Sequence, residues 1–101
     1  MSGWPNKKTD NKVTGATTKD LADYVTGFSE KHIGVEFQFY NSGSAAAEVR
    51  KSTTTSTEGP EKIFPGDSCT LRIHRVLAAN QYILDVLAGG VVLVGVYEIL
   101  P

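Results

Sequence analysis

The sequence predicts a mostly-β domain of the α+β class: a small antiparallel β-sandwich or barrel of five to six strands with one short N-terminal helix. Several segments alternate apolar and polar residues with the period of two that half-buried strands show. Turns rich in Gly, Pro, Asn and Ser separate these segments. With 101 residues, the chain has room for one domain.

The first 17 residues are polar and show neither helical nor strand periodicity. We therefore expect residues 1–17 to form a flexible arm and residues 18–101 to form a single β-rich domain. Trp4 is the exception in this arm, because an aromatic residue in a polar tail can anchor the tail to a neighbouring molecule.

The helix is predicted from four apolar residues at positions i, i+3, i+4 and i+7, namely Leu21, Tyr24, Val25 and Phe28. Thr17 or Thr18 can cap its first free N–H groups. Either Gly27 or Gly34 can end it.

The strands are predicted at 35–40, 45–50, 63–64, 69–74, 81–88 and 91–100. A polar loop rich in Thr and Ser occupies 52–60. In the earlier strands one face is apolar, and these residues are expected to point inward: Val35, Phe37, Phe39, Ala45, Ala47, Val49, Cys69, Leu71 and Ile73.

The last two strands flank Gly89-Gly90, a sequence typical of a two-residue hairpin turn. Pairing Ala88 with Val91 makes both faces of this hairpin apolar. One face holds Ile83, Leu87, Val92, Val94 and Val96, and the other holds Tyr82, Leu84, Val86, Leu93 and Tyr97. We assign the second face, which has the larger side chains, to the core. The first face is either covered by the helix or forms a subunit interface. Asp85 lies on it, either in a salt bridge or at an exposed rim.

No residue pattern indicates catalysis, a metal or a cofactor, so we do not expect an enzyme. The chain has two His and one Cys. Cys69 and His74 are five residues apart, so on one strand they point to opposite faces. There is no Cys-x-x-Cys or His-Glu-x-x-His motif.

Charge and composition narrow the possible partners. Lys and Arg number 10 against 11 Asp and Glu, so the basic excess that nucleic-acid binding requires is missing overall. The single cysteine cannot form an internal disulfide. The N-terminus lacks a signal-peptide pattern, and no apolar stretch is long enough to span a bilayer. We therefore expect an intracellular or virion location.

A mixed polar patch is predicted from Tyr40, Arg50, Arg72 and His74, provided that their strands share a sheet. Such a patch suits a glycan, an anionic headgroup or an acidic protein segment. The alternative is an ordinary solvated sheet face with cross-strand charge pairs, such as Glu48 with Arg72.

Two functions are compatible with these patterns. The first is a non-enzymatic structural or assembly protein that forms a homo-oligomer through the hairpin face of Ile83, Leu87, Val92, Val94 and Val96, with Trp4 reaching a neighbour. Small, cysteine-poor, threonine-rich chains with a polar arm are typical of phage and virus structural subunits, which is an analogy only. The second is a small recognition module that binds a glycan, a lipid headgroup or a protein partner through the mixed patch.

Overall fold

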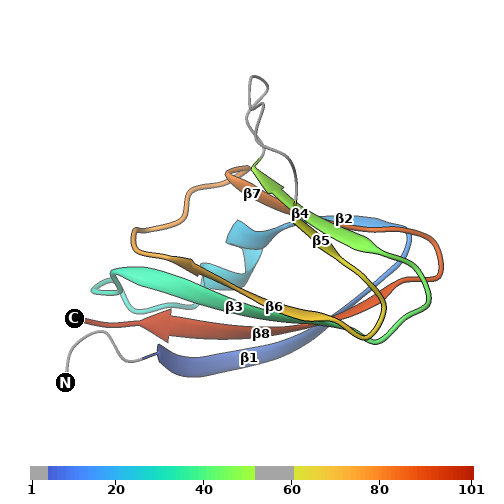
Figure 1. Ribbon diagram of the computed structural model, residues 1–101. Helices are drawn as coiled ribbons and strands as arrows, with labels where there is room; N and C mark the ends of the chain where they lie inside the picture. Colours follow the sequence, from blue (N-terminus) through green and yellow to red (C-terminus); the bar gives the residue numbers. More distant parts are fainter. Residues whose placement is uncertain (1–4, 52–60) are drawn as a thin grey trace.

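A computed structural model describes residues 5–51 and 61–101, and these residues form two antiparallel four-stranded sheets packed face to face (Figure 1). Sheet A contains, in order, β1 (Pro5–Thr14), β8 (Val91–Ile99), β3 (Gly34–Asn41) and β6 (Ser68–Ile73). Sheet B contains, in order, β2 (Thr17–Asp20), β7 (Tyr82–Val86), β4 (Ala47–Lys51) and β5 (Glu61–Ile63). The predicted mostly-β antiparallel sandwich is confirmed.

The strand order is that of a jelly roll. Each connection along the chain crosses from one sheet to the other, except that β4 and β5 are neighbours in sheet B. The order β1-β8-β3-β6 facing β2-β7-β4-β5 is the pair of Greek keys that defines this topology. Jelly rolls host many unrelated functions, so the fold by itself indicates none of them.

The core lies between the two sheets and is made by alternate residues of the strands. Its most deeply buried members include Val35, Phe37 and Phe39 of β3, Leu84 and Val86 of β7, and Val92, Val94 and Val96 of β8. Ala47, Val49 and Ile73 are buried too, while Cys69 and Leu71 are partly buried against the core. The inward faces predicted for β3, β4 and β6 are thus confirmed, except for Ala45, which precedes β4 and is only partly buried.

The predicted hairpin around Gly89-Gly90 is wrong, because β7 and β8 belong to different sheets. β7 pairs with β2 and β4, whereas β8 pairs with β1 and β3. Gly89 has a φ of +87°, which only glycine adopts easily, and the turn carries the chain across the sandwich. Both segments are strongly apolar because each is a central strand of its sheet.

The faces assigned to β8 are therefore inverted. Val92, Val94 and Val96 are at most 1% exposed and point into the core, while Leu93 and Tyr97 lie on the outer face of sheet A. With no pairing between β7 and β8, each strand turns its own apolar set inward.

The flexible arm is also wrong for residues 5–14, which form β1 and pair with β8 from Pro5–Ile99 to Thr14–Val91. The sequence does not predict β1, because most of the residues that this strand turns inward are polar. Partners in a strand pair share a face, so Thr9 and Asn11 point inward with Val13, the one buried apolar residue among the three. Trp4 and the polar loop at 52–60 lie outside the described residues.

The predicted helix is reduced to one 3₁₀ turn, η1 (Leu21–Val25), because residues 17–20 form β2 instead. Asp20 begins the turn by accepting a hydrogen bond from the N–H of Ala22 at 3.0 Å. Leu21 is fully buried, and the rest of the predicted stripe packs partly against the core. No helix among the described residues has the length and apolar character needed to cross a membrane.

A candidate recognition face on sheet A

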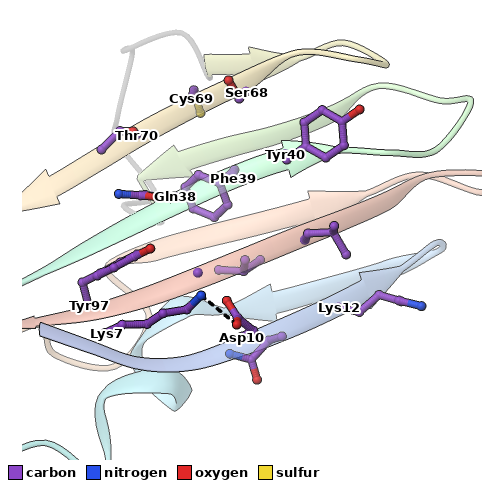
Figure 2. Close-up of a pocket in the computed structure, with 14 residues that line it drawn as sticks. Lys7, Asp10, Lys12, Gln38, Phe39, Tyr40, Ser68, Cys69, Thr70 and Tyr97 are labelled. Atoms are coloured by element: carbon purple, nitrogen blue, oxygen red, sulfur yellow. Dashed lines mark ion pairs between the residues drawn. The ribbon is translucent and has the colours of Figure 1, made fainter.

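The outer face of sheet A contains a hollow of about 540 Å³ that spans all four strands (Figure 2). We call it the sheet A face. Its outward side chains come from Lys7, Asp10 and Lys12 on β1, Leu93 and Tyr97 on β8, Gln38 and Tyr40 on β3, and Ser68 and Thr70 on β6.

Strand register aligns these residues into rows across the sheet. The central row runs from Asp10 through Gly95 and Gln38 to Thr70, each being the partner of the next. Gly95 has no side chain, so the floor at the centre of the hollow is main chain. Asp10 stands on one side of Gly95, and Gln38 and Thr70 stand on the other.

The ring of Tyr97 leans over Gly95. A Cβ added at Gly95 would lie 3.2 Å from Cε1 of Tyr97 and 3.7 Å from its hydroxyl oxygen. Figure 2 shows the ring edge-on, with Gln38 on one side and the Lys7–Asp10 pair on the other. Because Gly95 has no side chain, the Tyr97 ring can occupy the space above it.

Tyr40 and Leu93 make the apolar end of the hollow. They are partners across β3 and β8, and their side chains are 44% and 40% exposed. The hollow therefore combines two aromatic rings and one aliphatic side chain with a polar centre.

Ion pairs hold most of the charges on this face. Lys7 Nζ lies 2.8 Å from Asp10 Oδ2, and this hydrogen bond from Lys7 to Asp10 raises the pKa of Lys7. In the neighbouring row Arg72 Nη2 lies 2.6 Å from Glu36 Oε1. Burial alone would raise the pKa of Glu36, but hydrogen bonds from Gln38 and Arg72 outweigh it and lower that pKa.

The four residues of the predicted binding patch do not share one surface. Tyr40 and Arg72 lie on the outer face of sheet A. Arg50 is on β4, which belongs to sheet B, so the condition that the strands share a sheet fails for it. His74 is exposed just beyond the end of β6.

Charge pairing also differs from the expectation of a Glu48–Arg72 pair, because those residues are on different sheets. Glu48 instead faces Lys62, with 3.8 Å between the charged atoms. On the same sheet, Asp85 accepts hydrogen bonds from Arg50 Nε at 2.6 Å and the Thr18 hydroxyl at 2.8 Å.

The predicted interface residues are dispersed as well. Val92, Val94 and Val96 are core residues and cannot contact a partner while the sandwich is intact. Ile83 is buried, and Leu87 is 57% exposed in the turn after β7. These five residues therefore do not form one exposed surface.

The sequence alone did not assign Lys7, Asp10, Gly95 or Tyr97 to a binding face. The two β1 residues were missed because their segment has no apolar alternation. One signal was available on β8, where Gly95 interrupts an apolar run and Tyr97 follows two residues later, on the same face of the strand.

Within residues 5–51 and 61–101, no three His, Cys, Asp or Glu side chains are grouped closely enough to hold a metal ion. Burial raises the pKa of the Cys69 thiol to about 11, which keeps it protonated at neutral pH. No family model, curated protein or solved structure matches the chain.

Proposed function

We propose that the protein is a small non-catalytic recognition module and that the sheet A face binds its ligand. The observation that carries this proposal is the hollow, with the Tyr97 ring over Gly95 at its centre and further aromatic and polar side chains around it. Concave sites with a few polar groups placed among apolar ones are the usual form of ligand sites.

The ordinary explanation of a mixed polar sheet face is solvation with cross-strand charge pairs. The Glu36–Arg72 pair fits that explanation. Gly95 does not, because glycine inside a strand costs roughly 0.5–1 kcal/mol relative to alanine, and here it leaves room for the Tyr97 ring. This cost at the centre of the hollow favours a role for the tyrosine ring that Gly95 accommodates.

Self-association, the first function expected from the sequence, has less support. The hairpin face proposed for it included Val92, Val94 and Val96, which pack inside the sandwich. The edge strand β1 of sheet A carries three lysines and has a register shift between Lys7 and Thr9. Both features discourage pairing with the sheet of another molecule. A phage or virus subunit and an intracellular or virion location stay predictions.

Nuclear magnetic resonance can test the proposal. Amide spectra of the labelled protein should be recorded with neutral hexasaccharides, a heparin hexasaccharide, phosphatidylserine vesicles and an acidic peptide. We expect at least one probe to shift the amides of Gln38, Thr70 and Gly95, and light scattering to give a monomer. Shifts confined to sheet B, or a large particle without any probe, would contradict the proposal.

A further inference from the structure

We infer that the ligand of the sheet A face is a neutral saccharide, bound with an apolar ring face against Tyr97. This inference rests on the proposed function and names the chemical class that the site takes. Four properties of the face support it: its aromatic surface, its hydrogen-bonding groups, its charge balance and its size.

The aromatic surface suits a sugar ring. The Tyr97 ring lies above Gly95 and presents its two faces to either side of the hollow, as Figure 2 shows. Sugar rings carry C–H groups on their faces, which pack against the negative face of an aromatic ring. A second contact is available at Tyr40 and Leu93 on the same face, two rows from Tyr97 and one row beyond Gly95.

The polar groups suit hydroxyls. Ser68, Thr70 and the two tyrosines have hydroxyl groups that both donate and accept, as saccharide hydroxyls do. Gln38 donates from Nε2 to Glu36 at 2.8 Å, which leaves its amide oxygen as the acceptor that it offers to a ligand. A purely apolar ligand would leave these groups desolvated without partners, a cost of about 1–3 kcal/mol for each buried group.

The charge balance disfavours a polyanion. The face and its adjoining row hold three cations, Lys7, Lys12 and Arg72, and two carboxylates, Asp10 and Glu36. Two ion pairs, Lys7–Asp10 and Arg72–Glu36, already engage four of these five groups. Phosphate and sulfate recognition relies on clustered cations. Lys7 and Arg72 would first have to break their ion pairs with Asp10 and Glu36 before they could bind such a group.

The size suits a short oligosaccharide. Neighbouring strands lie about 4.8 Å apart, so the four strands place β1 and β6 about 14 Å from each other. The hollow of about 540 Å³ falls within the roughly 300–1,000 Å³ of small-ligand sites.

The test combines a glycan array, holding neutral and sulfated glycans, with titration of the best neutral glycan. We expect neutral glycans to bind and Tyr97→Ala to weaken the binding by roughly tenfold, because the stacking surface is lost. Tyr97→Phe keeps the ring and should stay within about threefold of the wild type. Lys62→Ala, a surface change on β5 of sheet B, is the matched control and should bind as the wild type does.

Each variant is first checked by thermal melting and by its amide spectrum, so that loss of binding is not loss of folding. If Tyr97→Ala unfolds, Gly95→Ala serves instead, since its Cβ would lie 3.2 Å from Cε1 of Tyr97, would push the ring by a few tenths of an ångström and should weaken binding. Binding of sulfated glycans or phosphatidylserine vesicles alone, with shifts on the sheet A face, would overturn the neutral saccharide and keep the recognition face. If no neutral glycan binds and no probe shifts that face, both proposals fail.

Discussion

Asn41 should be one of the residues on which the stability of the fold depends most. It ends β3, it is fully buried, and its side-chain amide is engaged at both atoms. Nδ2 donates to the carbonyl oxygens of Ala45 and Ile63, both at 2.8 Å, and Oδ1 accepts from the N–H of Gly43 at 3.0 Å. The side chain therefore ties the β3–β4 connection to the end of β5.

Asn41→Ala would leave three main-chain groups without their partner. A buried polar group that loses its hydrogen bond costs about 1–3 kcal/mol. The bond to Ile63 is buried, whereas the other two are partly buried, so water can replace them in part. We expect a loss of about 3–5 kcal/mol, a large share of the roughly 5–15 kcal/mol by which domains are stable.

Asn41→Asp sharpens this prediction, because a carboxylate can still accept from Gly43 but cannot donate to the two carbonyl oxygens. It would hold a negative charge beside those oxygens, so at neutral pH it should destabilise at least as much as the alanine. Protonation at low pH restores one donor and should narrow the difference between Asn41→Asp and the wild type.

Urea unfolding followed by intrinsic fluorescence gives the required free energies. Ser42→Ala is the matched control, since the neighbouring hydroxyl is exposed and makes only a 3.4 Å contact with the Val91 carbonyl oxygen. We expect this control to cost less than about 0.5 kcal/mol. A loss below about 1 kcal/mol in Asn41→Ala would refute the argument that these hydrogen bonds hold the connections together.

Three further predictions follow from burial and charge. Val94→Lys should abolish folding, because it places an unpaired charge in the core. Leu93→Lys, on the outer face, should shift the melting temperature little. Equal melting curves for the two variants would contradict the β8 register. Burial raises the pKa of Cys69 to about 11, so this thiol should react with a thiol reagent slowly in the native protein and quickly in denaturant. Fast labelling of the native protein would place the Cys69 side chain on the outer face of β6 instead. The pKa values of Glu36 and Asp85 lie below their ordinary 4.5 and 3.8. The stability that these carboxylates contribute is therefore complete above the ordinary values and is lost as the pH falls through the lower folded values. In thermal melting from pH 7 to pH 2, the melting temperature of Glu36→Gln should fall less than that of the wild type.

Local pattern predicted the parts of the fold that depend on one strand at a time. The inward faces of β3, β4 and β6 follow from alternation within each segment, because each strand turns its apolar residues to the core whatever its neighbours are. The free thiol and the antiparallel sandwich class were also determined by the sequence.

Tertiary structure decided which strands lie together, and with them the candidate site. Gly89-Gly90 permits either a hairpin or a step between sheets, and only the pairing of β8 with β1 and β3 selects the second. β1 becomes a strand through its hydrogen bonds to β8, since its own residues bury little apolar surface. The sheet A face draws on four segments scattered from Lys7 to Tyr97, and no local pattern could unite them, because strand pairing is set by long-range contacts.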